Sequence, residues 1–263
     1  MGLGLFQRPA VQVHLLKLVN GAIQIVDSEN DAVFRVDKNT GVVSTYLSKA
    51  AVQSHVGGVP VVNNWSGVSP NGEAVFYEGF SKSILQTNGA GVITTLVTTA
   101  ELEAAQGTGI TTPSSGLTYD ASGNLYWAEN NSDKVYKRAS DGTITSILGP
   151  ADFTPLIGSA VTYSGDTFLA PDGWMYLRAG ASGSTSNIFK FDPSNPGSTL
   201  QIVLSTADLI AGPAASSSIL QMSWCNGTLG FTTTGLAYYA LPEPGALGLL
   251  TLGSLALVRR RKA

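Results

Sequence analysis

Short apolar runs alternate with polar turns along most of the chain, and this pattern repeats about every fifty residues. Five turn glycines precede an apolar run, spaced by 51, 51, 50 and 54 residues: Gly21, Gly72, Gly123, Gly173 and Gly227. Most follow Asn or Asp, and such pairs supply the positive φ that tight hairpin turns require. The period therefore indicates repeated units joined by tight turns.

Two further columns share this period. Apolar pairs recur at spacings of 51, 51 and 53 residues: Val33-Phe34, Ile84-Leu85, Val135-Tyr136 and Ile188-Phe189. The last strand of each unit ends on a third column: Leu47, Val97, Leu148 and Leu204. A short motif (KAAV, TAEL, PADF or TADL) then follows, and this composition is typical of the first turn of a helix.

The best-formed unit, residues 115–149, divides into four strands of about five residues, a usual strand length. The apolar runs at 74–77, 125–127 and 174–177 lack strict alternation, as expected for strands covered on both faces. The sequence therefore predicts an all-β fold, a β-propeller of four-stranded blades. A β-sandwich and a β-solenoid are the alternatives.

The five turn glycines predict about five blades across residues 1–240. The last unit, 218–240, has room for three strands only. The chain is therefore either a five-bladed ring or a six-bladed ring truncated at its N-terminus, with five slightly favoured. Residues 241–263 form a separate C-terminal segment that includes a hydrophobic helix.

Composition narrows the function classes. Charged residues make up 13% of the chain, against about 25% in average domains. The net charge is −3 and becomes −7 without the four terminal cations, so we expect no nucleic-acid partner. The only cysteine is Cys225, which excludes an intramolecular disulfide, and the two histidines, His14 and His55, lack the spacing of a zinc motif.

The segment from Gly116 to Gly142, GLTYDASGNLYWAENNSDKVYKRASDG, resembles an NHL-type propeller repeat. The resemblance is good for this unit, fair for the units around Gly72 and Gly173, and weak at both ends. Gluconolactonase-type propellers are similar in shape.

The C-terminal segment has three parts in a fixed order. Pro242, Glu243 and Pro244 come first. An uncharged stretch follows, which includes Ala246, Leu250 and Val258; the cations Arg259, Arg260, Arg261 and Lys262 come last. The uncharged stretch is shorter than the ~20 residues of a spanning helix, and the cations are expected to stay cytoplasmic.

This order of parts is similar to the PEP-CTERM sorting signal of Gram-negative bacteria. The resemblance implies recognition by an exosortase, with cleavage near Pro-Glu-Pro, in bacteria that make exopolysaccharide. It further implies transient insertion in the inner membrane and then a cell-surface or extracellular location. The first nineteen residues lack the clean apolar core of a secretory signal peptide, so we expect the natural start to lie upstream.

An acidic column is the most suggestive chemical feature. Asp27, Glu78 and Glu129 each stand six residues after a turn glycine. NHL-type repeats commonly place an acid at this strand end, and the first interpretation is a carboxylate that accepts N–H bonds from the next loop. The second is a Ca²⁺ site, for which these three residues are weak candidates.

Two hypotheses follow. The first is an exported, non-enzymatic propeller, sorted by an exosortase, that binds exopolysaccharide or surface proteins. It rests on the tail, the repeats and the lack of a catalytic motif such as G-x-S-x-G or a P-loop. The alternative is an exported, metal-dependent hydrolase of the lactonase kind, which needs acidic side chains to converge on one ion. No catalytic residue and no obligatory cofactor are predicted.

Overall fold

The computed structural model describes residues 13–19, 22–88, 90–159, 161–181, 187–212, 218–225, 228–233 and 238–241. Strands dominate, and they fall into five sheets. In chain order the strands are β1 (Val13–Val19), β2 (Ala22–Asp27), β3 (Ala32–Asp37), β4 (Val43–Leu47); β5 (Val62–Val68), β6 (Ala74–Glu78), β7 (Ser83–Thr87), β8 (Ile93–Val97); β9 (Thr118–Tyr119), β10 (Leu125–Glu129), β11 (Lys134–Arg138), β12 (Ile144–Leu148); β13 (Thr162–Leu169), β14 (Met175–Gly180), β15 (Asn187–Phe191), β16 (Gln201–Leu204); and β17 (Ile219–Cys225), β18 (Thr228–Thr233), β19 (Tyr238–Leu241).

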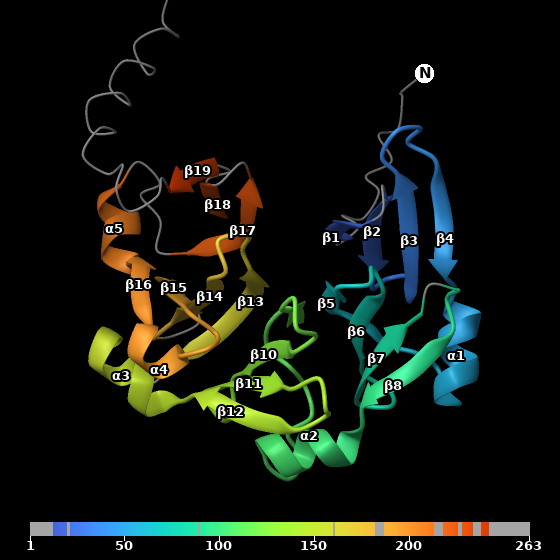
Figure 1. The fold of residues 1–263 in the computed structure, drawn as a ribbon, viewed down its shortest axis with the longest axis horizontal. Helices are drawn as coiled ribbons and strands as arrows, with labels where there is room; N and C mark the ends of the chain where they lie inside the picture. The colour runs from blue at the N-terminus through green and yellow to red at the C-terminus, as the bar shows by residue number, and fades with distance from the viewer. Residues whose placement is uncertain are drawn as a thin grey trace, which may run out of the picture.

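Each sheet pairs its strands antiparallel and in chain order. The first strands of consecutive sheets lie next to one another, β1 beside β5, then β9, β13 and β17. The sheets thus follow an arc, with β1–β4 and β17–β19 at its two ends (Figure 1). This arrangement confirms the predicted all-β propeller.

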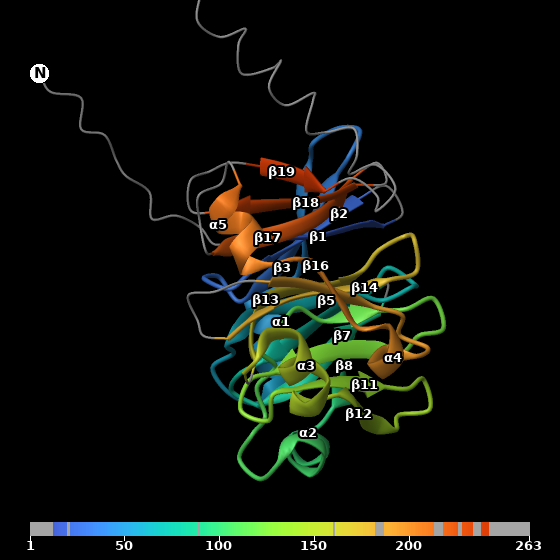
Figure 2. The same cartoon turned by 90° about the vertical axis from the view of Figure 1, so that its left-hand side faces the viewer.

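Four of the five helices connect one sheet to the next, and the fifth, α4, lies inside a hairpin turn. They are α1 (Lys49–Val56), α2 (Thr99–Gln106), α3 (Pro150–Ile157), α4 (Pro196–Thr199) and α5 (Thr206–Ala211). The four connecting helices begin at the motifs read as helix starts. α2 and α5 have capping boxes, Thr98 with Glu101 and Ser205 with Asp208, which satisfy orphan N–H groups. The connecting helices gather toward one side of the stack, and α4 lies toward the other (Figure 2).

The core is divided into four layers, each between two consecutive sheets. Each layer holds apolar side chains of both sheets and one fully buried side chain of the connecting helix: Val52 in the first layer, Leu102 in the second, Phe153 in the third and Leu209 in the fourth. Burying one large apolar side chain stabilises a fold by roughly 1.5–3 kcal/mol. Contact between sheets is therefore the main source of stability.

The middle strands explain the apolar runs that lack alternation. All five residues of β6 are buried. Phe76 points into the layer shared with β1–β4, whereas Val75 and Tyr77 point into the layer shared with β9–β12. Successive side chains of a strand point to opposite faces, so a strand between two layers needs apolar residues at every position.

The described residues supply four four-stranded sheets and one three-stranded sheet, β17–β19. This agrees with the count of about five units, and the sixth blade stays a prediction. The expected C-terminal helix lies outside the described residues. Within the part of the chain that is described, no helix has the length and apolar character needed to cross a membrane.

Gly67 marks the closest approach of two inner strands. The N–H of Leu117 donates to the carbonyl of Ser66 on β5 across 3.3 Å. A Cβ added at Gly67 would lie 1.8 Å from the carbonyl oxygen of Leu117. Because that oxygen belongs to the backbone, no side-chain rotation relieves the clash.

We predict that Gly67→Ala lowers the free energy of unfolding by at least about 2 kcal/mol, because overpacking forces the backbone to move. Urea denaturation measures this change. Gly116→Ala is the matched control, since its added Cβ would meet Thr167 at 3.5 Å, an ordinary contact distance. Equal losses in the two variants would contradict the close approach.

Candidate functional site

The three carboxylates of the acidic column lie at equivalent places in three different sheets. Asp27 ends β2, Glu78 ends β6 and Glu129 ends β10. Each precedes a four-residue turn, and all three side chains are buried. The turns close on residues of positive φ, namely Asp31, Lys82 and Asp133. The acids recur along the chain because each sheet repeats the same strand end and the same turn.

Each of these carboxylates accepts hydrogen bonds mainly from its own turn. Both oxygens of Glu129 are used: Oε1 accepts from the N–H and the side-chain amide of Asn131, and Oε2 accepts from the N–H and the hydroxyl of Ser132. Glu78 is bound in the same way by Phe80 and Ser81, with a further N–H from Val61.

Asp27 accepts two backbone N–H bonds, from Glu29 and Asn30, and one bond from the side-chain amide of Asn30. A Ca²⁺ ion needs six to eight oxygen ligands at about 2.3–2.6 Å. The three carboxylates do not fit this requirement, because they sit in separate sheets and their oxygens are already bonded. Among the described residues, no cluster of three or more His, Cys, Asp or Glu side chains could hold a metal ion.

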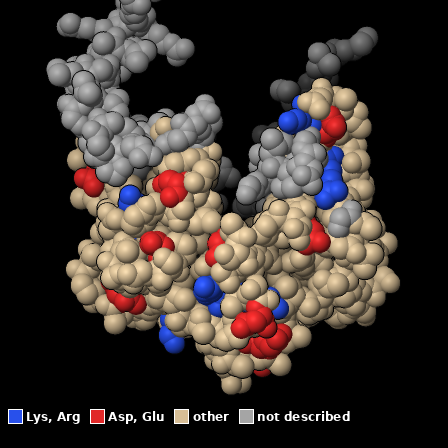
Figure 3. Space-filling view, viewed as in Figure 1, with Lys and Arg blue, Asp and Glu red and all other residues tan. Residues whose placement is uncertain are grey.

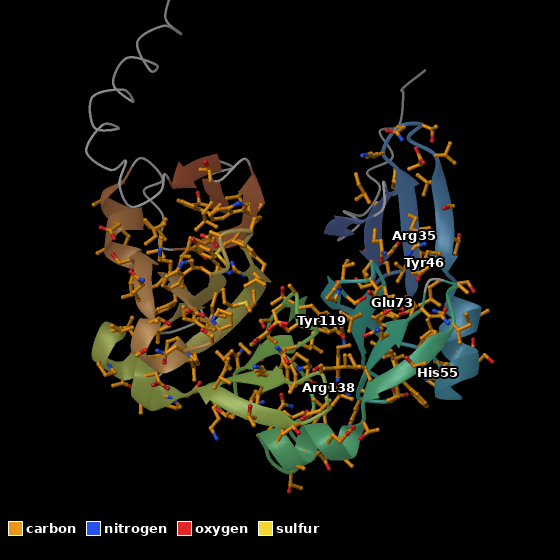
Figure 4. All side chains as sticks on the ribbon, in the orientation of Figure 1. Arg35, Tyr46, His55, Glu73, Tyr119 and Arg138 are labelled. Carbon is orange, nitrogen blue, oxygen red and sulfur yellow. The ribbon has the colours of Figure 1, made fainter. Side chains whose placement is uncertain are left out.

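A polar pocket of about 350 Å³ lies between sheets β5–β8 and β9–β12. Its walls are two turns, 69–73 and 120–124, which end the inner strands β5 and β9. Helix α1 leads into the start of β5, whereas the turn 69–73 follows the end of β5. The pocket therefore lies at the end of the strand that points away from the connecting helices. Glu73, Tyr119 and Arg138 lie along this junction (Figure 4).

Local turn chemistry fixes both walls. In the first wall, the N–H of Ser69 donates to the carbonyl of Glu73, and Gly72 adopts a φ of +84°. In the second, Asp120 accepts N–H bonds from Ser122 and Asn124. Such side-chain-to-backbone bonds hold tight turns in one conformation. The pocket is therefore built on rigid backbone.

A chain of hydrogen bonds crosses the pocket from one sheet to the other. The Tyr119 hydroxyl donates to Oε1 of Gln86 across 2.6 Å, and Nε2 of Gln86 donates to Oε2 of Glu73 across 2.6 Å. The hydroxyl of Ser69 also donates to Oε2 of Glu73. One oxygen of Glu73 is thus used twice, whereas none of the described residues bonds to Oε1.

The two charged groups of the pocket are not paired with each other. No ion pair within the described residues joins Arg138 to Glu73. The Nε atom of Arg138 is buried and has no hydrogen-bond partner among the described residues. A buried donor without an acceptor costs about 1–3 kcal/mol. Two other carboxylates lie within reach of the charge of Arg138. Hydrogen bonds from Thr98 lower the pKa of Glu101, those from Thr143 lower the pKa of Asp141, and the positive charge of Arg138 adds to both effects. Acidic and basic side chains lie close together at the lower middle of this view of the surface (Figure 3).

Tyr119 responds to both charged groups. Burial raises the pKa of Tyr119 to about 12, the positive charge of Arg138 acts against that rise, and Glu73 adds to it. The phenol therefore stays protonated and keeps donating to Gln86 across the physiological range. The pocket offers a guanidinium, a free carboxylate oxygen and several hydroxyls, a set suited to binding a polar small molecule.

The sequence does not predict this pocket, although a signal exists. Glu73 follows a turn glycine directly, where the other units have Ala22, Asn124, Trp174 and Thr228. Arg138 stands two residues after the second apolar column, where the other units have Val36, Thr87 and Phe191. Each of these positions is charged in its own unit and uncharged in the other units.

The sorting residues 242–244 and the stretch 246–262 lie outside the described residues.

We predict that Glu129→Gln lowers the free energy of unfolding by about 1–3 kcal/mol, because an amide nitrogen cannot accept the bonds of Ser132.

We also expect CaCl₂ to leave the melting temperature unchanged, since a ligand of the native state must raise it. Thermal and urea unfolding test both points. Asp141→Asn, in an exposed turn, is the control and should change stability far less; a Ca²⁺-dependent rise abolished by Glu129→Gln would restore the metal hypothesis.

We predict an alkaline loss of stability that depends on Tyr119. Its folded pKa lies above the ordinary value of 10, so its stabilising effect is complete below pH 10 and is lost as the pH rises toward 12. The loss is about 2 kcal/mol. Tyr119→Phe should be less stable at neutral pH and should lose less between pH 10 and 12. Parallel curves of unfolding free energy against pH for the two proteins would contradict this role.

Comparison with known proteins supports the fold alone. No family model and no curated protein matches the chain. Among solved structures, the chain is similar to one from a nidogen/laminin complex, with a TM-score of 0.60 and 14% identity, covering 89% of this chain and 77% of that one. It is also similar to a calcium-binding protein, regucalcin, from Agrobacterium tumefaciens, with a TM-score of 0.56 and 14% identity over 91% and 72% of the two chains.

A streptogramin B lyase structure gives a TM-score of 0.52 and 16% identity, covering 91% of this chain and 71% of that one. These identities are too low to transfer an activity. The structural neighbours are NHL- and gluconolactonase-like β-propeller proteins, and they include both enzymes and binding proteins. The chain is therefore a β-propeller of this general shape.

Proposed function

We propose that this chain is the propeller of an exported surface protein that is sorted by an exosortase and acts as a binding module, not as an enzyme. The propeller presents a polar pocket on a rigid rim, and the C-terminal segment directs the protein outward. Exopolysaccharide or another surface protein is the partner that such a location favours.

The observation that carries the binding role is that Arg138 and Glu73 line one pocket without forming an ion pair within the described residues. The Nε atom of Arg138 is unbonded, and Oε1 of Glu73 accepts no bond from the described residues. Folded proteins normally pair buried polar groups with each other or with water. Two opposite charges that share a pocket without joining leave room for a ligand between them. This arrangement supports recognition of a polar molecule and requires no catalytic group.

The sorting role rests on the order of parts in the C-terminal segment. The prolines at 242 and 244 fix φ and remove two N–H donors, so this stretch favours an extended backbone. The uncharged stretch is too short for a stable span, and the four cations favour the cytoplasmic side. A processing enzyme in the inner membrane can use such a segment as a temporary tether.

The alternative of a metal-dependent, lactonase-like hydrolase has less support. Regucalcin, a structural neighbour, is described as calcium-binding, but the three carboxylates that the sequence offers here as calcium ligands accept hydrogen bonds from their own turns. The Ca²⁺ titration described above decides between the two functions.

We predict that the triple change Pro242→Ala, Glu243→Ala and Pro244→Ala blocks processing in a host that carries an exosortase. The wild-type chain should be shortened and recovered outside the inner membrane. The variant should remain full-length in the membrane fraction, because the extended recognition segment is lost. Fractionation and mass measurement with an antibody against the propeller report both outcomes.

The matched control is Pro193→Ala with Pro196→Ala, which removes two prolines from a turn of the propeller that contains α4. This control should be processed like the wild type. All three proteins are expressed behind a secretory signal peptide. Recovery of the intact, uncleaved wild-type chain from the cytosol would then overturn the sorting role. That result would not bear on whether the pocket binds a ligand.

A further inference from the structure

We propose that the pocket between sheets β5–β8 and β9–β12 binds a hydroxylated carboxylate of the uronic-acid type, with the ligand carboxylate on Arg138 and a ligand hydroxyl on Glu73. This inference rests on the proposed binding role and names the ligand class. The chemistry is the same for a free sugar acid and for a uronate unit of a polysaccharide, and the experiment below separates these two sources.

The guanidinium of Arg138 is suited to binding an anionic acceptor on the ligand. Its Nε atom is buried and unpartnered, and guanidinium groups bind carboxylates through two parallel N–H bonds. Arg138 ends β11, so its backbone is fixed by the ladder with β10. The terminal nitrogens of Arg138 are the donors that a carboxylate in the pocket can reach, because the Nε atom is buried. Two parallel N–H bonds to them would neutralise the charge of the guanidinium.

The carboxylate of Glu73 is suited to accepting a hydrogen bond from a donor on the same ligand. Its Oε2 atom accepts from Ser69 and Gln86, and its Oε1 atom accepts no bond from the described residues. A compact anion without hydroxyls, such as phosphate, would face this carboxylate with nothing to donate. A hydroxyl on the ligand can donate to Oε1, so one molecule must carry both an anionic group and hydroxyls.

The remaining walls favour hydroxyls over an ammonium group. The hydroxyls of Ser122 and Ser140 make no hydrogen bond with the described residues, and the oxygen of Tyr119, which donates to Gln86, is still able to accept. Hydroxyl and amide groups both donate and accept, which matches the hydroxyls of a sugar ring. The volume of about 350 Å³ lies at the low end of known ligand pockets, roughly 300–1,000 Å³, and suits a single ring.

The neighbouring junction shows a cation that the fold does satisfy. Between sheets β1–β4 and β5–β8, the guanidinium carbon of Arg35 lies 3.5 Å from the ring centroid of Tyr46, and its Nη2 donates to the carbonyl of Gly72 across 3.4 Å. Gln24 donates to the same carbonyl. The same architecture therefore supplies partners for Arg35 and supplies none for the Nε atom of Arg138.

Isothermal titration of the full chain with D-glucuronate, an oligoglucuronate, D-glucose, acetate, glycine and phosphate tests the ligand class. D-Glucuronate or its oligomer should bind at least tenfold more tightly than the other four. Arg138→Gln should weaken that binding by tenfold or more, since a charge-assisted bidentate contact is lost. Lys137→Gln is the matched control, because it removes a neighbouring positive charge that points to the opposite face, and it should bind as the wild type does.

The thermal stability of the variants separates a ligand-binding role from a structural one. Arg138→Gln should change the melting temperature little in the absence of ligand, because the arginine donates no hydrogen bond to the described residues and acts on Glu101 and Asp141 through its charge. An arginine that held the two sheets together would lower the melting temperature clearly. Tighter binding of the oligomer than of free glucuronate identifies a polysaccharide as the source, and equal binding identifies the free acid.

Three outcomes overturn the inference. Binding of glycine or phosphate that depends on Arg138 would keep the pocket as a binding site but show that its ligand class is wrong. Binding of D-glucuronate that Arg138→Gln leaves unchanged would place the site elsewhere. Absence of binding by all six probes would remove the ligand class, while the fractionation experiment would still decide the sorting role.

Discussion

The requirement that each sheet cover both of its faces governs the whole molecule. Every inner sheet lies between two others, so its middle strands must be apolar at successive positions, as β6 is. Carboxylates enter mainly at strand ends, where turns and water supply partners, and a polar side chain inside a strand needs a partner of its own, as Gln24 has in the carbonyl of Gly72. The distribution of chemistry follows from this constraint: carboxylates, hydroxyls and cations occur at the rims, and the layers between sheets hold apolar side chains.

The buried turn carboxylates are the clearest consequence. Glu78 and Glu129 are fully buried, a position that an ionised group tolerates only with a full set of hydrogen bonds. The N–H and hydroxyl groups of the following turn supply those bonds. The acid therefore selects one turn conformation, including the positive φ at Lys82 and Asp133. Repetition of the acid along the chain records this structural need and indicates no shared ligand.

The fold could be predicted from the sequence because its signals are local and repeated. A turn glycine, an apolar pair and a helix start recur at one period, and each has a direct physical cause. The propeller and the helical turns after Leu47, Val97, Leu148 and Leu204 are confirmed. The orientation of Asp27, Glu78 and Glu129 could not be fixed in advance, because a column of acids gives their recurrence along the chain and not the direction in which each carboxylate points.

The pocket could not be predicted because it depends on packing between sheets. Glu73 and Arg138 lie 65 positions apart in the sequence, and only the contact between the second and third sheets brings them to one cavity. The oxygen of Glu73 that stays free depends further on Gln86, which accepts from Tyr119 and donates to Oε2 of Glu73. The repeat predicts only the residues that every unit needs for the fold. A charged residue at a position where the other units are uncharged is not needed for the fold in this way, so the repeat does not explain it.

Departures of this kind are where a repeated fold can acquire a specific function. A buried donor without an acceptor lowers stability, and the sequence retains one in Arg138, on a cavity that Glu73 also lines. At the adjacent junction the comparable cation, Arg35, is covered by an aromatic ring and bonded to a carbonyl, so the architecture is able to satisfy such a group. The difference between the two junctions lies in their side chains and not in their backbone. It follows that the unbonded Nε atom of Arg138 is a property of one junction, and this local difference is the physical basis for assigning the binding role there.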